Sequence, residues 1–564
     1  MRVFSPTDTD IQDTVNAAFA TNGGHNPPNH GQFSDARFAF LFKPGKYAQD
    51  IPIGYYTTVH GLGASPDDVV FTGAKGVYCE EGSYAATTGA LDNFWRGAEN
   101  FRSAAAFKWQ TGTGMLWAVS QASPLRRVHV EQSLVLYQYE PPYYQAGYAS
   151  GGFLADSLLE AGSIAGSQQQ WFTRNVRYNN PPNASKLELS AWNSVFTGCT
   201  GATPPLHCGN KNPDGSQSAY AASTTPVIAE KPFVTVNGDR NDGFALVVPP
   251  RVDNSVGPSW SHRISQPPPS IDFAHVYVAD PSIDTAATIN AKIALPHISA
   301  VLLSPGIYKL TGPLRLNKEG FVLLGVGLAT LVPAGATAAI EVTAPSCRVA
   351  GVLLQAGAQA SPALLDVQSQ AAGAVLQDVS VRVGGPDTLE VQAETMVHVA
   401  ADEVIGDNLW LWRADHTVTG IVTNRSNPCS HGLVVDGKGV VMYGLAVEHT
   451  LADLTVWNGE QGQTFFYQSE LPYDVTHADF GAKGFVGYRV APHVQVHAAY
   501  GVGVYHYFRD YAVEVASAIV APGAAFFANA FAVYLNGKGT ITHVLNGQGS
   551  TTSAGGAHQA YVCP

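Results

Sequence analysis

Residues 40–47 read FLFKPGKY and residues 301–308 read VLLSPGIY, so a strand, a Pro-Gly turn and a second strand occur twice in the chain. The two Pro-Gly pairs are 261 residues apart (305 − 44). Glycine tolerates the sharp corner of such a turn, and repetition at a long interval indicates a duplicated architecture. The pattern predicts two similar β-rich units in tandem.

The segments that flank the two stretches are duplicated in the same order. An amphipathic segment precedes each one, at residues 11–20 and 285–294, and a Gly-x-Gly corner follows, at residues 61–63 and 325–327. A helix in that place can cap the exposed core of the first coil of a solenoid. Because parallel crossovers are right-handed, we expect an all-β fold of two tandem right-handed parallel β-helix (solenoid) domains.

Proline-rich segments predict where the two units are joined. Pro-Pro at residues 249–250 and Pro-Pro-Pro at residues 267–269 are typical of a stiff linker,. We expect an N-terminal β-helix domain over residues 1–230, a linker over residues 231–273 and a C-terminal β-helix domain over residues 274–564. A chain of 564 residues is long enough for two such domains,.

The composition favours β structure and excludes several kinds of partner. The chain has 57 Gly and 35 Pro residues, and only 13% of its residues are charged, which is too few for long surface helices,. Its formal net charge of −13 disfavours nucleic acid and anionic membranes, but not a neutral polysaccharide,. No apolar run approaches the roughly 20 residues that span a bilayer. We expect a monomer without nucleic-acid or membrane partners.

The cysteines and the first residues bear on the compartment. Cys199 and Cys208 bracket a short, turn-rich loop, so we expect a disulfide between them, which favours an oxidising compartment,. Met1 is not followed by an apolar leader, and we expect the mature form of a secreted protein,. The close pair His493 and His497 has no third ligand nearby in sequence, so we expect no metal and no cofactor,.

Two glutamates in the second unit have the spacing of one solenoid coil. Glu448 and Glu470 are 22 residues apart (470 − 448). Since neighbouring strands lie roughly 4.7–4.9 Å apart, such residues project side by side from one face. Two carboxylates held in this way are the minimum machinery for cleaving a glycosidic bond, and Trp457 and Tyr473 nearby are candidate sugar platforms. Two solvated surface glutamates are the alternative.

A pair with the same spacing occurs in the first unit. Gln168 and Ser190 are 22 residues apart (190 − 168), and Gln168 begins the run QQQW at residues 168–171. Amides and an indole suit hydroxyl recognition and stacking on a sugar face. The register among Gln168, Gln169 and Gln170 stays open, and an internal ladder of amides is the alternative.

A third cluster is WLWRADH at residues 410–416. In a strand, Trp410 and Trp412 share one face, and Arg413 and Asp415 share the other. For Trp412 and Asp415 to touch one sugar, the strand must therefore bend or end between them. Core tryptophans beside a structural Arg–Asp pair are the alternative.

These motifs closely resemble glycoside hydrolase family 55. The resemblance rests on the stretches at residues 410–416, 447–449 (VEH), 467–474 (YQSELPYD) and 166–171 (GSQQQW), and it covers nearly the whole chain. It implies an exo-acting β-1,3-glucanase (laminarinase) that inverts the anomeric configuration and needs no metal. It also implies an active site in the cleft between two β-helices.

The resemblance also implies a role for each candidate residue. Glu470, in the C-terminal domain, is expected to be the general acid that protonates the leaving oxygen. Glu448 is expected to belong to the network that holds the attacking water, completed from the first domain by Gln168 and Ser190. The residues expected to bind the glucan are Asp415, Tyr473, Trp457, Gln170, Trp412 and His449.

Two other interpretations explain part of the sequence. A non-catalytic solenoid that binds carbohydrate would keep the tryptophans and glutamines but would not need paired glutamates. A β-helix polysaccharide lyase or pectin hydrolase acts on acidic sugars and usually shows clusters of Asp or basic residues, which this sequence lacks. Release of free glucose from laminarin separates the glucanase from both.

Overall fold

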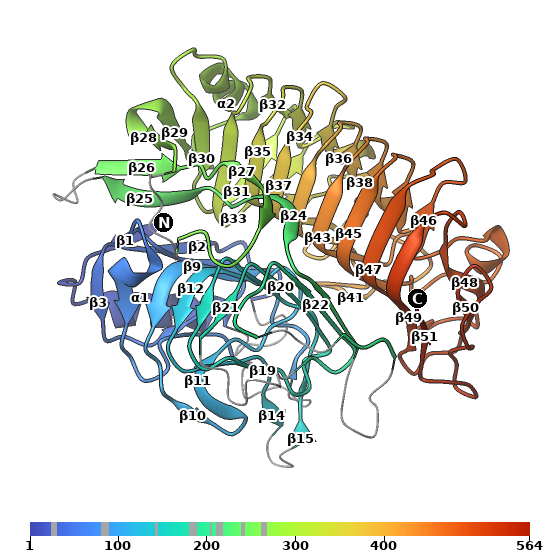
Figure 1. Ribbon diagram of the computed structural model, residues 1–564. Helices are drawn as coiled ribbons and strands as arrows, with labels where there is room; N and C mark the ends of the chain where they lie inside the picture. The colour runs from blue at the N-terminus through green and yellow to red at the C-terminus, as the bar shows by residue number, and fades with distance from the viewer. Residues whose placement is uncertain are drawn as a thin grey trace.

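The computed structural model consists of two parallel β-solenoids lying side by side (Figure 1). The N-terminal solenoid is coloured blue to cyan, and the longer C-terminal solenoid runs from green to red. The structure describes residues 1–23, 31–80, 89–140, 145–179, 189–202, 206–209, 218–237, 243–260 and 268–564, and the statements below concern these residues. The predicted fold class of tandem parallel β-helices is confirmed.

The N-terminal solenoid is built on a 13-stranded sheet. Its main path is parallel throughout and consists of β1 (Arg2–Phe4), β2 (Phe38–Phe42), β5 (Thr57–Gly61), β9 (Arg96–Ser103), β12 (Pro124–Val130), β17 (Phe153–Ala155), β20 (Gln170–Arg174), β22 (Asn193–Thr197) and β23 (Ala219–Ala222). The strands β3 (Gly45–Tyr47), β6 (Val69–Phe71), β18 (Leu158–Leu159) and β21 (Arg177–Tyr178) join this sheet at its side. A four-stranded sheet completes several coils with β10 (Lys108–Trp109), β11 (Gly112–Leu116), β13 (Ser133–Val135) and β19 (Ser163–Ile164).

The C-terminal solenoid is built on two long sheets. The 12-stranded sheet contains β29 (Val276–Ala279), β30 (Ala300–Leu303), β31 (Ile307–Leu310), β33 (Val322–Pro333), β35 (Arg348–Gln355), β37 (Val375–Val383), β39 (Ile405–Arg413), β43 (Val441–Glu448), β45 (Gly462–Glu470), β47 (His497–His506), β49 (Phe526–Tyr534) and β51 (Gln559–Val562). The nine-stranded sheet contains β32 (Leu314–Leu316), β34 (Ile340–Val342), β36 (Ser361–Val367), β38 (Ala393–Val399), β42 (Cys429–Val435), β44 (Thr455–Trp457), β46 (Tyr488–Val490), β48 (Glu514–Val520) and β50 (Thr540–Leu545). One continuous apolar core fills the space between them.

The chain between the N-terminal and C-terminal solenoids forms antiparallel ribbons. The strand β24 (Thr225–Ala229) pairs with β27 (Arg251–Ser255), and β26 (Gly243–Val247) pairs with both β25 (Phe233–Asn237) and β28 (Ser270–Asp272). The segment expected to be a stiff linker therefore supplies strands that lie along the junction (Figure 1).

A helix caps the start of each solenoid, as the duplicated amphipathic segments predict. The helix α1 (Ile11–Asn22) buries Ile11 and Val15 in the N-terminal core. The helix α2 (Ala286–Ile293) buries Ile289 in the C-terminal core, and the Thr285 side chain caps its first turn. An apolar stripe on each helix thus covers a core that the first coil leaves open.

The two Pro-Gly-x-Tyr turns make the same hydrogen bonds. The Tyr47 hydroxyl donates to the carbonyl oxygens of Phe4 at 3.3 Å and Lys43 at 2.7 Å. The Tyr308 hydroxyl donates to the carbonyl oxygens of Ala279 at 2.9 Å and Ser304 at 3.1 Å. Phe4 and Ala279 each end the first strand of their solenoid, so the tyrosine ties the turn to the opening strand in both copies.

The glycine of each turn is required by a proline that packs against it. Gly45 has φ +146°, and a Cβ added there would lie 2.2 Å from Pro6 Cγ. Gly306 has φ +155°, and a Cβ there would lie 2.3 Å from Pro281 Cγ. The same close approach in both copies confirms the duplication that the sequence predicts.

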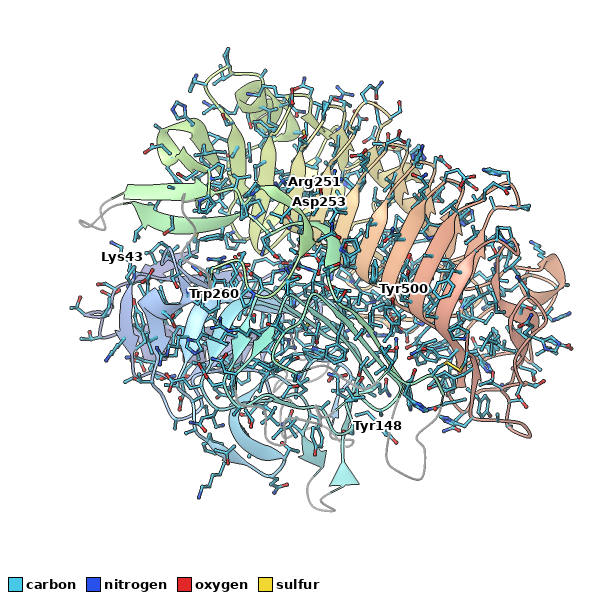
Figure 2. The ribbon with its side chains drawn as sticks, in the orientation of Figure 1. Lys43, Tyr148, Arg251, Asp253, Trp260 and Tyr500 are labelled. Carbon is cyan, nitrogen blue, oxygen red and sulfur yellow. A yellow bond between two sulfur atoms is a disulfide. The ribbon has the colours of Figure 1, made fainter. Side chains whose placement is uncertain are left out.

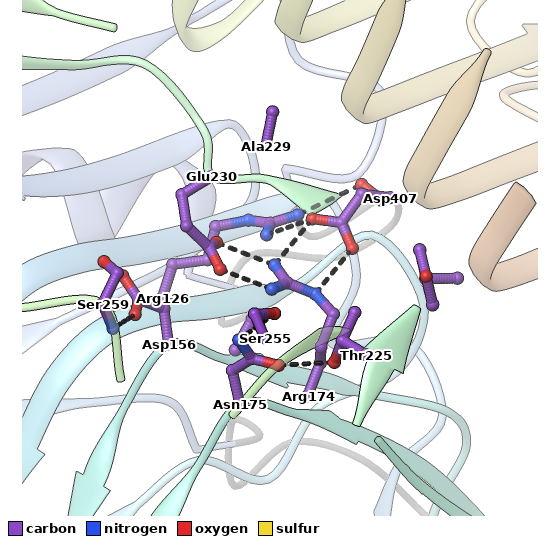
Figure 3. Close-up of polar contacts among 12 residues, drawn as sticks. Arg126, Asp156, Arg174, Asn175, Thr225, Ala229, Glu230, Ser255, Ser259 and Asp407 are labelled. Carbon is purple, nitrogen blue, oxygen red and sulfur yellow. Dashed lines mark hydrogen bonds and ion pairs between the residues drawn. The ribbon is translucent and has the colours of Figure 1, made fainter. Parts of the chain in front are cut away.

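A buried network of arginines and acids joins the two solenoids (Figure 3). From the N-terminal solenoid, Arg126 donates to Asp378 and to Asp407 of the C-terminal solenoid, each at 2.7 Å. Arg174 donates to Asp407 at 3.0 Å and to Glu230 at 2.8 Å. Asp407 and Arg174 are 0% exposed. Since a buried charge is tolerated only when it is paired, each of these groups depends on its partner in the other solenoid.

The disulfide expected between Cys199 and Cys208 is wrong. Cys208 is bonded to Cys563, 355 residues further along the chain, and the bond is visible in Figure 2. The Cys199 thiol instead lies against the carbonyl oxygens of Thr173 and Thr197. The loop that carries Cys208 lies beside the end of the C-terminal solenoid, so closeness in sequence does not identify the partner.

Removing Asp407 tests the network between the solenoids. In Asp407→Ala, two buried guanidinium groups lose a carboxylate, and we expect the free energy of unfolding to fall by about 3–5 kcal/mol. Urea titration measures it. The control is Arg315→Ala, because Arg315 is 58% exposed and its pair with Glu341 is a surface pair, which should be worth at most about 1 kcal/mol,. A loss at Asp407 no larger than the control would contradict the role of the network.

Candidate active site

Glu448 and Glu470 lie side by side at the ends of two neighbouring strands. They are Cα partners in the parallel pair of β43 and β45, so a 22-residue spacing is one coil at this place. Parallel neighbours are roughly 4.7–4.9 Å apart, which places both carboxyl groups at one edge of the sheet.

A cavity of about 330 Å³ opens at this edge, between the two solenoids. Its walls come from both units, so neither solenoid forms the cavity alone. The N-terminal solenoid contributes Gln32, Leu91, Asp92, Phe94, Gln121 and Ser150, and the C-terminal solenoid contributes Trp410, Trp412, Asp415, His416, Glu448, His449, Glu470 and Tyr473.

Glu448 is the deeper of the two carboxylates. It is 4% exposed, and both of its oxygens accept hydrogen bonds, from Gln121 Nε2 at 2.9 Å and from Trp410 Nε1 at 2.9 Å. Burial, and then the negative charge of Glu470, raise the pKa of Glu448 to about 8,. At neutral pH Glu448 therefore keeps a proton.

Glu470 reaches the cavity and is surrounded by polar partners. Its side chain is 17% exposed and accepts a hydrogen bond from the Tyr473 hydroxyl. His449 Nε2 lies 3.6 Å from Glu470 Oε2. Burial alone would lower the pKa of His449, but its pairing with Glu470 and the charge of Asp415 raise it to about 9. A positively charged His449 therefore faces Glu470 at neutral pH.

Trp412 and Asp415 line the same cavity, because the strand ends between them. The strand β39 stops at Arg413, and Asp415 follows it. The condition that the strand bends or ends between Trp412 and Asp415 is met, because the strand ends. Arg413 does not pair with Asp415, since it donates to Asp474 at 2.9 Å. Burial would raise the pKa of Asp415, but the hydrogen bond from His416 and the charges of His416 and His449 hold it below its ordinary range.

The expected role of Trp457 as a sugar platform is wrong. Trp457 is 0% exposed, and its ring packs on His497 with the ring centroids 4.9 Å apart. It belongs to the strand β44 of the nine-stranded sheet and points into the apolar core. Trp457 is near Glu470 in sequence but not at the cavity, because consecutive strands of a coil belong to different sheets.

Three expected residues of the first solenoid do not line the cavity. Gln168 and Ser190 are stacked one coil apart, since the Ala191 N–H donates to the Gln168 carbonyl oxygen. However, Gln168 Nε2 donates inside the solenoid to the Val119 carbonyl oxygen at 3.1 Å, and Ser190 is bonded to Asn193 and Ser194. Gln170 accepts a hydrogen bond from Tyr505 across the junction. The expected contact of Gln168 and Ser190 with the Glu448 network is therefore wrong, and Gln170 joins the solenoids.

Gln121 and Ser150, which the sequence does not single out, take their place beside Glu448. Gln121 contacts Glu448 directly and lies 3.4 Å from both Ser150 and Gln468 Oε1. Gln121 and Ser150 stand in no recognisable motif, and the coils of the N-terminal solenoid differ in length. A fixed spacing therefore could not identify them.

Among the described residues, no group of three or more His, Cys, Asp or Glu side chains is arranged to hold a metal ion. In the same part of the chain, no helix has both the length and the apolar character needed to cross a membrane.

Known proteins resemble this chain over its full length. A family model described as the LAM55 pectate lyase-like domain matches residues 276–470. An exo-β-1,3-glucanase from Streptomyces sp. (strain SirexAA-E / ActE) is 36% identical, over 98% of this chain and 86% of the relative. The structure of sacteLam55A from Streptomyces sp. SirexAA-E has a TM-score of 0.86 and 33% identity, and covers 100% of this chain and 97% of that one. A glutamate-to-alanine variant of sacteLam55A in complex with glucose has a TM-score of 0.85, with the same identity and coverage.

The pKa of Glu448 predicts how stability depends on pH. The unfolded chain releases this proton near pH 4.3, whereas the folded protein keeps it to about pH 8,. Between these values the unfolded state binds fewer protons, so the contribution of Glu448 to stability falls as pH rises. We expect the unfolding free energy of Glu448→Gln, relative to the wild type, to rise between pH 5 and 8 by at most about 1.4 kcal/mol per pH unit. Urea titrations at several pH values measure it.

A matched control is Glu403→Gln, because the Glu403 side chain is 64% exposed. The difference in unfolding free energy between Glu403→Gln and the wild type should stay constant between pH 5 and 8. A flat difference for Glu448→Gln as well would show that the folded protein does not keep this proton.

Proposed function

The chain belongs to glycoside hydrolase family 55, and from that premise we propose that it hydrolyses β-1,3-glucan (laminarin) from one chain end and releases glucose. One observation carries the proposal: Glu448 and Glu470 stand in register in a cavity that only the two solenoids together enclose. Paired carboxylates are what glycosidic cleavage requires, and a cavity of this size lies at the lower end of the range for small-ligand sites, roughly 300–1,000 Å³.

Glu470 acts as the general acid. Its carboxyl reaches the cavity, whereas both oxygens of Glu448 are engaged by Gln121 and Trp410. Burial of Glu448 beside Glu470 keeps one proton on the pair at neutral pH, and this proton must pass to Glu470 before the leaving oxygen can take it. The Tyr473 hydroxyl orients the Glu470 carboxyl through its hydrogen bond.

The attacking water is held by Glu448. With the proton of the pair on Glu470 and Glu448 ionised, Glu470 protonates the leaving oxygen as the glycosidic bond breaks, and water attacks the anomeric carbon from the opposite face while Glu448 accepts its proton. Attack from the opposite face inverts the anomeric configuration, and the pair again holds one proton. Gln121 and Ser150 of the first solenoid take the place in this network that Gln168 and Ser190 were expected to fill. Inversion itself rests on the family resemblance.

The terminal glucose binds between the tryptophans and the charged groups of the cavity. The stacked rings of Trp410 and Trp412 form one wall, with their centroids 5.7 Å apart. Asp415 and His449 line the cavity beside them and supply charged partners for sugar hydroxyls,.

The protein acts outside the cell, as a monomer. The Cys208–Cys563 disulfide supports secretion, because such bonds persist in oxidising compartments,. A cavity whose walls all come from one chain supports a monomeric enzyme.

The test of this function combines the wild type with Glu470→Gln. With laminarin, we expect the wild type to release glucose, seen first as the α anomer by proton NMR. Glu470→Gln loses the general acid, and we expect kcat to fall roughly 10²–10⁴-fold while the Kd for laminaribiose changes little. Calorimetry of laminaribiose binding measures the Kd.

The exposed variant Glu403→Gln should keep wild-type turnover. Substantial residual activity of Glu470→Gln would contradict its role as the acid. Binding of laminarin by the wild type without release of any sugar would favour a non-catalytic carbohydrate-binding solenoid.

A further inference from the structure

Besides Gln121–Glu448, a second side-chain contact links the two solenoids across the cavity. Gln32 Nε2 lies 2.5 Å from His416 Nε2, and both residues line the cavity. His416 begins the hairpin of β40 (His416–Thr417) and β41 (Gly420–Ile421). Its Nδ1 is 2.9 Å from Asp415 Oδ1, and its ring packs against Trp412 with the centroids 5.4 Å apart. We call the Gln32–His416 contact the bridge.

The first solenoid holds its half of the bridge firmly. The Tyr56 hydroxyl donates to the Gln32 carbonyl oxygen, and Arg382 of the other solenoid donates to the Tyr56 hydroxyl at 2.6 Å. The next residue, Phe33, is 8% exposed and packs on the His416 ring with the centroids 5.7 Å apart. Gly385 leaves room for Phe33, since a Cβ there would lie 2.8 Å from its ring. The turn that carries Gln32 is thus clamped onto the C-terminal solenoid.

The order of the strands places the bridge at one end of the cleft. The sheet runs β39, β43, β45 and β47, so His416 follows the first of these strands, and Glu448 and Glu470 end the next two. On the far side of Glu470, its register partner Tyr505 on β47 faces Trp192 of the first solenoid, with the ring centroids 5.5 Å apart. Tyr505 is 1% exposed and is not among the residues that line the cavity, so the bridge is the contact that bounds the cavity on the β39 side of the carboxylates.

We propose that the Gln32–His416 bridge is the end stop that admits one glucose unit beyond the cleaved bond and so makes the enzyme exo-acting. The proposal rests on the proposed function. A chain that continued past the terminal sugar would have to break the bridge and displace the clamped turn. A β-1,3-glucan longer by one unit on that side is therefore excluded, and glucose is the unit released.

The test removes both side chains of the bridge, in Gln32→Gly with His416→Ala. The substrate is laminarihexaose labelled at its reducing end, and the products of the first cleavage are separated by chromatography. The wild type should give glucose and a labelled pentaose. In the double variant, we expect the share of laminaribiose with a labelled tetraose to rise at least about tenfold, because an opened end binds a second sugar.

The control is Thr419→Ala, an exposed residue of the same hairpin whose side chain contacts Thr417. It should give the wild-type products. An active double variant that still releases only glucose at the first cleavage would overturn the end stop. If the double variant does not fold, the same products are measured for His416→Ala alone. A raised share of laminaribiose supports the end stop, and release of glucose only overturns it. A wild type that releases no glucose would instead contradict the proposed function, so the two failures are distinguishable.

Discussion

The candidate active site depends on the buried ion pairs that hold one solenoid against the other. Asp407 accepts from Arg126 and Arg174, and none of the three side chains is more than 2% exposed. While buried, these charges are satisfied only by one another, which favours the one relative position of the solenoids that pairs them,. Gln121 can reach Glu448, and Gln32 can reach His416, only in that position. The candidate active site therefore lies in the junction between the two β-helices.

The chemistry follows from the one-coil register within the second solenoid. Stacking places Glu448 directly beside Glu470, and the other solenoid covers the pair and removes Glu448 from water. Burial next to a like charge then holds a proton that an exposed carboxylate would release,. The protonation state of Glu448 therefore depends on the junction between the solenoids.

The sequence predicts what is local or strictly repeated. The Pro-Gly-x-Tyr turns, the two capping helices and the register of Glu448 with Glu470 all depend on short stretches or on one coil length. Contacts between the solenoids are not encoded in spacing, which is why Gln121 was missed and Gln168 was placed in the wrong environment. The surroundings of Trp457 depend on which sheet of the coil its strand joins, and the partner of Cys208 lies 355 residues away, so nearness in sequence identifies neither.

The most direct test of this account is a crystal structure of Glu470→Gln with laminaribiose. We predict one glucose ring in the cavity between Trp412, Asp415 and the Gln32–His416 contact, with the glycosidic oxygen at residue 470 and the second ring on the side away from that contact. A sugar bound elsewhere on either solenoid, with this cavity empty, would contradict the account.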